Sequence, residues 1–374
     1  MQSSQPSNRL VSLDVFRGIT IAAMILVNNP GNWNAVYPPL LHAKWHGWTP
    51  TDLIFPFFLF IVGVAIVFSF AKRLQRPGGK KAIYGKILRR SLILFSLGLL
   101  LAVGGNSDLA HLRIPGVLQR IALVYLPVSI LVIHTSVRWQ VVIAIGLLLL
   151  YWALMAKVPV PGFGAGKWDE PISALSSYLD RLFFTGRMYK ETWDPEGLLS
   201  TLPSISTALS GVLAGHWLRS VRSAQQKVVG LLLGGAVCFG LGYLVNLDFP
   251  INKNLWSSSF VLVTSGLAAV GLGILYWVVD LRGWRKWSWP FLVFGMNAIT
   301  VYILSSFFAK MMVYNWRVTQ PDGTSIALKT WLYQTLFASW ASPMNASLFY
   351  ALSYVFFWFL VMVLFYRKRM FVKI

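Results

Sequence analysis

The chain has 374 residues, of which 56% are hydrophobic and only 12% are charged, and its formal net charge is +21. Charged residues make up about a quarter of an ordinary soluble domain, so this composition excludes a soluble globular protein. It indicates a protein that crosses a membrane several times. The single cysteine, Cys238, excludes a disulfide framework.

The hydrocarbon core of a bilayer needs a helix of about 20 apolar residues, and ten segments of the chain fit this pattern. In chain order they are residues 13–29, 52–71, 91–104, 115–133, 139–156, 198–217, 228–246, 255–279, 290–310 and 346–366. The segment 330–341 is aromatic and amphipathic, and we expect it to lie at the membrane surface. The sequence therefore predicts an all-α polytopic membrane helix bundle of about ten transmembrane helices, forming one domain over residues 1–374.

The distribution of charge orients these spans, because Lys and Arg collect in cytoplasmic loops. If the N-terminus lies inside, most of the 33 Lys and Arg fall on the inner side, together with only two of the 12 acids, Asp14 and Asp280. Both termini are then cytoplasmic, and the longest outer segments are 157–197 and 311–345. Nucleic-acid binding is not expected, because no basic domain with interleaved aromatic residues stands outside the spans.

Three polar residues of the first span are candidates for a function. Asp14 and Arg17 are three positions apart on one helix face, which suits either an ion pair that anchors the helix end or a role in binding. Asn28 follows Arg17 by eleven residues, which places it roughly 16 Å further along the helix axis. Its amide could donate to a carbonyl or an oxyanion, or it could cap the helix.

His42 lies in the first outer loop, ten residues before Asp52 at the start of the second span. A histidine exchanges a proton near neutral pH and can act as a nucleophile, although in an outer loop it is often a plain surface residue. Asp52 could orient the ring, and it could equally cap the helix that begins at Thr49-Pro50. Three aromatic residues are expected to shield the ring from water, namely Trp45, Trp48 and Phe55.

Three further polar clusters lie at the outer ends of spans, within Arg113–Arg120, Trp193–Gly197 and Asn252–Ser257. A charge inside a span is costly unless it is paired or faces a cavity. The acids of the second cluster could begin a helix or bind an amine. We expect these clusters to line one polar cavity with a further amide, through Arg113, Gln119, Arg120, Asp194, Glu196, Asn252, Lys253, Asn254 and Asn297.

Several kinds of chemistry are not expected. One cysteine cannot build a zinc site, the five histidines are scattered, and no His-Glu-x-x-His motif occurs. A P-loop and a Gly-x-Gly-x-x-Gly motif are also missing from the sequence. We therefore expect no metal centre, no nucleotide hydrolysis and no dinucleotide redox chemistry.

The motifs, taken in order, resemble the catalytic region of the heparan-alpha-glucosaminide N-acetyltransferase family. They are Leu13–Gly18, Asn28, His42–Gly47, Thr51–Pro56, Arg113–Arg120, Asp194–Gly197, Asn252–Ser257 and Gly295–Asn297. The resemblance implies transfer of acetyl from cytoplasmic acetyl-CoA across the membrane to the amine of a terminal glucosamine. It also implies that His42 is the essential histidine, as an acetyl-carrying nucleophile or as a general base, with Asn28 assisting it and Asp52 beside it.

Acetyl-CoA would then dock at the basic inner face, where we expect Arg17, Lys86, Arg89 and Arg90, with Asp14, to meet its phosphates.

The outer segments 157–197 and 311–345 differ in character from those of the family. Since these parts would hold the acceptor, we expect an envelope or recycled cell-wall amino sugar in a bacterial cytoplasmic membrane. Membrane lipid surrounds such a chain, and a homodimer is one form that it could take. The alternatives are an amino-sugar or muropeptide permease and an O-acyltransferase of an envelope polysaccharide.

Overall fold

The computed structural model describes residues 10–74, 79–104, 112–184 and 188–372. Its helices are α1 (Val11–Asn28), α2 (Ile54–Leu74), α3 (Gly79–Val103), α4 (Val117–His134), α5 (Val137–Lys157), α6 (Leu175–Phe184), α7 (Thr201–Arg219), α8 (Ala224–Val245), α9 (Ser258–Leu275), α10 (Trp289–Met296), α11 (Ala298–Lys310), α12 (Leu328–Tyr333) and α13 (Pro343–Arg367). Short 3-10 or π segments are η1 (Pro38–Leu40), η2 (Pro50–Leu53), η3 (Pro171–Ser173), η4 (Tyr276–Leu281), η5 (Met311–Asn315) and η6 (Gln334–Ala338). Strands β1 (Arg317–Thr319) and β2 (Ser325–Ala327) form an antiparallel hairpin in which Val318 pairs with Ile326.

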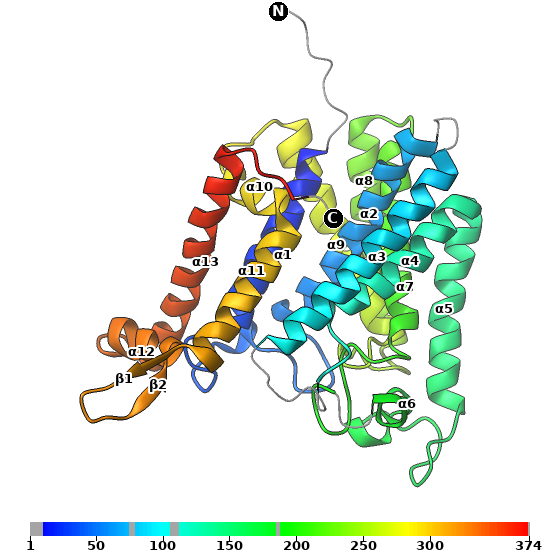
Figure 1. Ribbon diagram of the computed structural model, residues 1–374. Coiled ribbons are helices and arrows are strands. Elements are labelled where there is room, and N and C mark those ends of the chain that lie inside the picture. Colours follow the sequence, from blue (N-terminus) through cyan, green and yellow to red (C-terminus); the bar gives the residue numbers. More distant parts are fainter. Residues whose placement is uncertain (1–9, 75–78, 105–111, 185–187, 373–374) are drawn as a thin grey trace, which may run out of the picture.

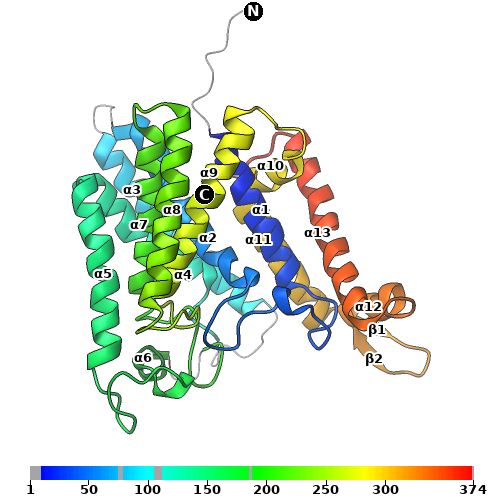
Figure 2. The same ribbon diagram turned by 180° about the vertical axis from the view of Figure 1, so that it is seen from behind.

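The long helices run between two ends of the molecule, as Figures 1 and 2 show from opposite sides. Within the described residues, eight helical segments are long and apolar enough to cross a membrane. These eight match predicted spans, and α3 and α7 coincide with the other two. The predicted class, a polytopic helical membrane protein, is confirmed. The segment expected at the membrane surface forms α12 and η6, which are too short to cross a bilayer.

One predicted span has the wrong boundary. Residues 290–310 do not form a single helix, because the backbone leaves the helical region at Asn297 (φ −127°, ψ 35°). The Asn297 side chain binds the C-terminal tail instead: its Nδ2 donates to the carbonyl oxygen of Met370 and its Oδ1 accepts from the amide of Val372, both at 3.1 Å. The long apolar segment therefore begins at Ala298 and continues through η5.

Glycines allow the central helices to approach each other closely. A Cβ atom added at Gly63 of α2 would lie 1.9 Å from the carbonyl oxygen of Ala208 in α7. One added at Gly211 of α7 would lie 1.9 Å from the carbonyl oxygen of Phe60 in α2. Such reciprocal contacts are the usual way in which helices pack in lipid, where the hydrophobic effect does not drive them together. The same kind of contact joins α1 to α10.

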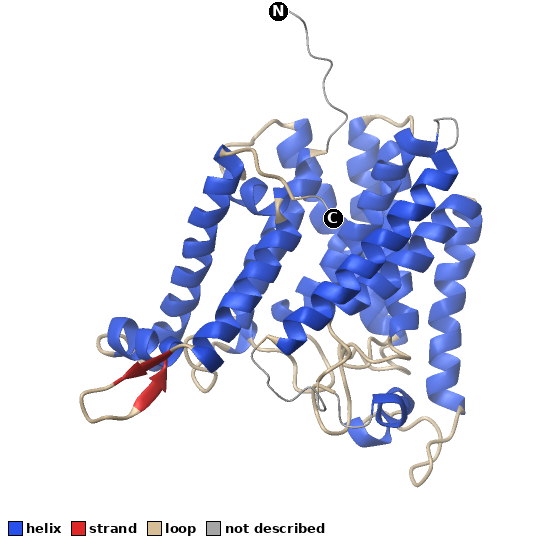
Figure 3. Ribbon diagram, in the orientation of Figure 1, coloured by secondary structure: helices blue, strands red, loops and turns tan. Residues whose placement is uncertain are grey.

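The two ends of the bundle differ in their connections. Helix α1 begins and α13 ends at one end, which we call the terminal end (Figure 1). The opposite end carries the segments 29–53, 158–184, 188–200 and 246–257, together with α12 and the hairpin, and Figure 3 shows loops gathered there. We call it the loop end. Residues 185–187 of the predicted outer segment 157–197 lie outside the described residues.

Candidate active site

His42 and Asp52 meet at the loop end, as their spacing predicted. The ring Nδ1 of His42 lies 2.7 Å from Oδ1 of Asp52. The Asp52 side chain is fully buried, whereas 47% of the His42 side chain is exposed. The second carboxylate oxygen, Oδ2, accepts from the amides of Ala43 (3.0 Å) and Thr49 (2.9 Å). Asp52 therefore caps the start of η2 and orients the His42 ring at the same time.

Lys253 reaches the same ring from another loop. Its Nζ lies 3.0 Å from Nδ1 and 3.1 Å from Nε2 of His42, and 3.6 Å from Oδ1 of Asp52. Burial lowers the pKa of Lys253 below its ordinary value, while the charges of Asp52 and Glu196 act against that shift. An ammonium, an imidazole and a carboxylate thus form one hydrogen-bonded cluster.

A backbone bridge holds the two loops of this cluster together. The amide of Gly47 donates to the carbonyl oxygen of Ile251 at 2.7 Å, next to a parallel bridge between Gly47 and Asn252. Gly47 has φ +89°, a conformation that glycine adopts without steric cost. Asn252 closes its own turn, since its Oδ1 accepts from the amide of Leu255. This buried turn directs Lys253 toward His42.

A cavity of about 320 Å³ opens beside His42. Six stretches of chain form its walls: the end of α1, the loop before η2, the start of α2, the segment that leads into α4, and the two loops around 189–196 and 253–254. Of the predicted site residues, it is lined by Asn28, His42, Arg113, Glu196, Lys253 and Asn254. The structure therefore brings together residues that are more than two hundred positions apart in the sequence.

Arg113 forms one wall and joins α4 to the loop 188–200. Its Nε and Nη2 bind the two carboxylate oxygens of Asp194 at 2.8 and 2.6 Å, and Nη2 also pairs with Glu196. Asp194 is completely buried and accepts in addition from the amides of Tyr189 and Glu196. Because all these interactions occupy its oxygens, Asp194 holds the wall in place, and Glu196 is the acid that lines the cavity.

Arg120, Gln119 and Asn252 lie behind the His42 cavity and do not line it. Arg120 is 1% exposed; its Nη2 donates to the carbonyl oxygen of Gly197 and to Oγ of Ser200, and its guanidinium lies 5.2 Å from the centre of the Trp256 ring. Arg120 therefore supports the loop that carries Glu196. Gln119 lines a second cavity, which shares Arg113 and Val117 with the first.

Asn28 is the last residue of α1, and the structure places its side chain at the cavity. The next residue, Asn29, takes the capping position, and its Nδ2 donates to the carbonyl oxygen of Ile25 at 2.8 Å. Within the described part of the chain, the Asn28 amide has no hydrogen-bond partner. It is available to a ligand in the cavity.

The aromatic residues expected around His42 behave differently from one another. Phe55 lines the cavity. Trp45 donates to the carbonyl oxygen of Trp168, and Trp48 donates to the hydroxyl of Tyr243. Neither indole lines the cavity, since each N–H finds a partner in another loop, and the shielding of His42 by these two residues stays a prediction.

Asn297 and the inner basic residues are not at this site. Asn297 lies at the terminal end, bound to the tail, and lines neither of the two large cavities. Arg17 pairs with Asp14 at 3.0 Å and lies 3.4 Å from the carbonyl oxygen of Gly295. The three α3 residues predicted to meet the donor lie in the first half of the helix: Lys86 and Arg89 are exposed, and Arg90 is half-buried against the Tyr125 ring.

Sequence reasoning missed Tyr189 and Lys190, which line the cavity, because they come from a loop whose path depends on tertiary contacts. Lys44 and Trp193 also line it; they lie within the motifs His42–Gly47 and Trp193–Gly197, but no role was assigned to them. Trp193 is held by the edge of Trp45, with ring centroids 5.5 Å apart.

Comparison with known proteins agrees with this arrangement. The family model for the heparan-alpha-glucosaminide N-acetyltransferase catalytic region matches residues 9–232, which is more than half of the chain. The chain belongs to this family. The match includes α1, the His42–Asp52 loop and the loop with Asp194 and Glu196.

Two members of the N-acetyltransferase family show how far the similarity extends. Heparan-alpha-glucosaminide N-acetyltransferase from Homo sapiens is 32% identical over 425 aligned residues, and the enzyme of that name from Mus musculus is 30% identical over 427. Each alignment includes 98% of this chain but only 60% and 61% of the relative. The chain thus spans about three fifths of the length of these relatives.

Proposed function

We propose that this protein is a transmembrane acetyltransferase that acetylates the amine of a glucosamine-type sugar at the loop end, with acetyl-CoA as donor. The family membership supports the reaction class, and the name of the human and mouse relatives supports an amino-sugar acceptor. The single observation that carries the proposal is the His42–Asp52 pair beside a cavity.

The His42–Asp52 contact prepares the ring for proton transfer. If Nδ1–H donates to the buried Asp52 carboxylate, Nε2 carries the lone pair, and the carboxylate stabilises the charged ring that forms. The acceptor amine attacks the acetyl carbonyl carbon, the carbon–sulfur bond breaks, and CoA leaves as the thiolate. His42 removes the amine proton, which then passes to the thiolate or to water. In the two-step form, Nε2 first carries the acetyl group.

Other cavity residues would assist this reaction. The unpartnered amide of Asn28 and the ammonium of Lys253 can donate to the oxygen that gains negative charge in the transition state. Asn254 and Glu196 can bind hydroxyl and amine groups of the acceptor, while Arg113, Asp194, Arg120, Gln119 and Asn252 fix the walls. Asn297 would act only through the shape of the terminal end.

Donor docking and orientation form the second part of the proposal. We place the terminal end in the cytoplasm, because Lys and Arg concentrate there, and we place the CoA phosphates among Arg17, Lys86, Arg89 and Arg90, with Asp14 holding Arg17. A bacterial cytoplasmic membrane remains the predicted location, and a homodimer remains an expected form.

Replacing His42 tests the reaction. In proteoliposomes with acetyl-CoA and glucosamine, His42→Ala is expected to reduce acetyl transfer at least about 10³-fold, because catalysis by the ring is lost. His46→Asn, four residues on and outside the cavity, is the control and should keep near wild-type activity. Equal thermal stability of both variants in detergent separates loss of chemistry from loss of folding. Full activity of His42→Ala would reject the assignment.

Labelled acetyl-CoA without acceptor separates the two routes. Acid-labile label on the wild-type protein, and none on His42→Ala, is the result expected of an acetyl-histidine. Transfer without any protein-bound label would mean direct attack of the amine.

A further inference from the structure

The amine of Lys253 lies over the ring of His42. Nδ1 of His42 contacts Oδ1 of Asp52 at 2.7 Å, which leaves Nε2 as the ring nitrogen that can carry an acyl group. The Nζ of Lys253 lies 3.1 Å from this Nε2 and 3.0 Å from Nδ1. A position in the ring plane at these two distances would overlap Cε1, the ring carbon between the nitrogens. The Lys253 amine therefore lies above one face of the ring.

That position matches the approach of a nucleophile to an acetylated histidine. The carbonyl group of an acetyl-imidazole is conjugated with the ring and lies in its plane, so a nucleophile reaches the carbonyl carbon from above or below that plane. An acetyl carbon on Nε2 of His42 would be one bond away from the atom that Nζ of Lys253 contacts at 3.1 Å. Aligned reacting atoms about 3–3.5 Å apart form a near-attack geometry. An amine of the protein itself thus stands beside the acetyl group.

Hydrogen bonds and packing fix the turn that carries Lys253. The carbonyl oxygen of Lys253 accepts from the amide of Trp256 at 3.0 Å, and the amide of Asn252 donates to Oγ of Ser257 at 3.0 Å. Trp256 has φ +54°, which is unusual for a bulky residue, and its fully buried ring packs edge-on against Phe55 with centroids 5.2 Å apart. Only 12% of the Lys253 side chain is exposed. The amine is therefore held at the ring.

The surroundings of Lys253 set how reactive its amine is. Burial lowers the pKa of Lys253, so a larger fraction of the side chain is the neutral amine that acts as a nucleophile. The carboxylate of Asp52, 3.6 Å from Nζ, acts against this shift, as does the charge of Glu196. The two acids thus slow a reaction of Lys253 without preventing it.

We propose that Lys253 is a self-acetylation site, which takes the acetyl group from Nε2 of His42 when no acceptor amine occupies the cavity. The neutral Nζ attacks the acetyl carbon, an amide bond forms, the bond between that carbon and Nε2 breaks, and one proton of Nζ passes to Nε2. His42 returns to its starting form, and Lys253 becomes an uncharged acetyl-lysine. This inference rests on the two-step form of the proposed function.

Acetylation of Lys253 removes a positive charge from the site. The amide N–H that replaces the ammonium is a weaker donor to the oxygen that gains negative charge in the transition state. The Asp52 carboxylate loses its neighbouring cation at the same time. The modified protein is therefore expected to transfer acetyl more slowly, so that the enzyme limits its own activity when acetyl-CoA is present and the acceptor is scarce.

The test incubates the purified protein with isotopically labelled acetyl-CoA, with and without glucosamine, and maps acetyl-lysine by mass spectrometry of its peptides. Acetyl-lysine is stable in acid, which separates it from acetyl-histidine. Without glucosamine, label at Lys253 is expected to be at least about tenfold higher in the wild type than in His42→Ala, because an oriented donor acts at a very high effective concentration. Added glucosamine should lower the label, because it takes acetyl from the same nitrogen.

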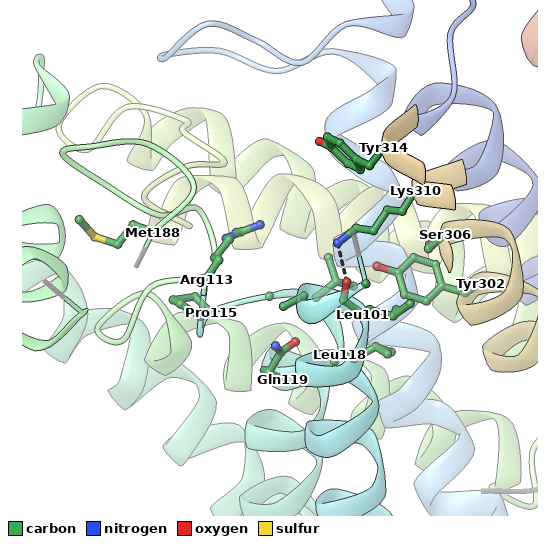
Figure 4. A pocket seen from close by; sticks show the side chains of 15 residues that line it. Leu101, Arg113, Pro115, Leu118, Gln119, Met188, Tyr302, Ser306, Lys310 and Tyr314 are labelled. Carbon is green, nitrogen blue, oxygen red and sulfur yellow. Dashed lines mark hydrogen bonds between the residues drawn. The ribbon is translucent and has the colours of Figure 1, made fainter. Parts of the chain in front are cut away.

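Three other lysines are internal controls for non-enzymatic acetylation. Lys44 and Lys190 line the His42 cavity and are exposed. Lys310 lines the neighbouring cavity, where its Nζ donates to the carbonyl oxygen of Leu101 (Figure 4). Within the described residues, no hydrogen bond joins any of these three to His42. They should carry the same low level of label in the wild type and in His42→Ala.

A second measurement follows the activity. Incubation with acetyl-CoA alone, before glucosamine is added, should lower the initial rate of glucosamine acetylation in proportion to the fraction of Lys253 that is modified. The guanidinium of Lys253→Arg is not a nucleophile under these conditions. The rate of this variant, which is compared only with itself, should not change after the same incubation.

The contrary results are distinct from one another. If the wild type acetylates glucosamine but leaves Lys253 unlabelled, the inference is wrong and the proposed function stands. Equal label at Lys253 in the wild type and in His42→Ala would mean chemical acetylation by acetyl-CoA and would also overturn the inference. Label that leaves the initial rate unchanged would refute the self-limitation. If Lys253 is labelled only when His42 is present, but glucosamine is not acetylated, the inference stands and the acceptor of the proposed function is wrong.

Discussion

Single residues at the loop end serve structure and chemistry together. Asp52 caps η2 through the Thr49 amide and holds His42 through its other oxygen. A carboxylate has four acceptor positions, so one buried acid can do both. The sequence showed that these two roles are compatible, and the geometry shows that both contacts form.

Asp180 offers a pH-dependent test of the loop structure. It lies in α6, where its Oδ1 accepts from the amide of Leu198, and burial raises its pKa from the ordinary 3.8 to about 6, with the charge of Asp194 adding to the rise. Between these two pH values the folded protein binds the proton more tightly than the unfolded chain. The protonated Asp180 therefore adds to the free energy of unfolding below about pH 4. This contribution, on the order of 3 kcal/mol, is lost as the pH rises to about 6.

Thermal unfolding in detergent between pH 4 and 7 measures this pH-dependent loss of stability. The Asp180→Asn variant keeps an acceptor for the Leu198 amide but cannot ionise. Its stability relative to wild type should therefore rise as the pH increases. Glu170→Gln, at an exposed position of the same outer segment, is the control. If the difference in thermal stability between wild type and Asp180→Asn were the same at every pH in this range, the prediction would be wrong.

At the scale of elements, the close contact of α2 with α7 fixes where His42 can sit. Helix α2 carries η2 and Asp52 at its start, and α7 follows the loop that contains Glu196. Two reciprocal glycine contacts set their separation. A change in this separation moves two walls of the cavity at once.

We predict that Gly63→Ala destabilises the protein by roughly 1–3 kcal/mol, because the new Cβ would lie 1.9 Å from a carbonyl oxygen and the backbones must separate. The control is Gly146→Ala in α5, where an added Cβ has no neighbour within 4 Å. That change should leave stability unchanged or increase it by up to about 1 kcal/mol. Thermal unfolding in detergent measures the stability of both variants. If Gly63→Ala and Gly146→Ala changed stability by the same amount, close packing of α2 against α7 would not be the cause.

At the scale of the whole molecule, the positions of the two ends predict sidedness. The turn between α7 and α8 contains Arg222 and lies at the terminal end, whereas the tip of the β hairpin contains Asp322 and lies at the loop end (Figure 1). With Cys238 replaced by Ala, we expect a membrane-impermeant maleimide to label Asp322→Cys in intact cells and Arg222→Cys only after the membrane is opened. The reverse pattern would place His42 in the cytoplasm and reject transfer to the outer side.

The sequence was sufficient for most of the fold because apolar segments of membrane length are a local signal. Nine of the ten predicted spans coincide with helices along most of their length. The exception, at Asn297, depended on a contact with the tail more than seventy residues away. No local pattern contains such a contact.

The site was predictable only in part, for the same physical reason. His42 and Asp52 could be paired because ten residues separate them, whereas Lys253 lies more than two hundred residues from either of them in the sequence. The sequence by itself determined a membrane bundle with polar motifs at one end. Only the tertiary structure decided that Lys253 meets His42, that Asp194 is occupied by Arg113 and that Asn297 lies elsewhere, because hydrogen bonds between distant loops depend on where the packed helices place those loops.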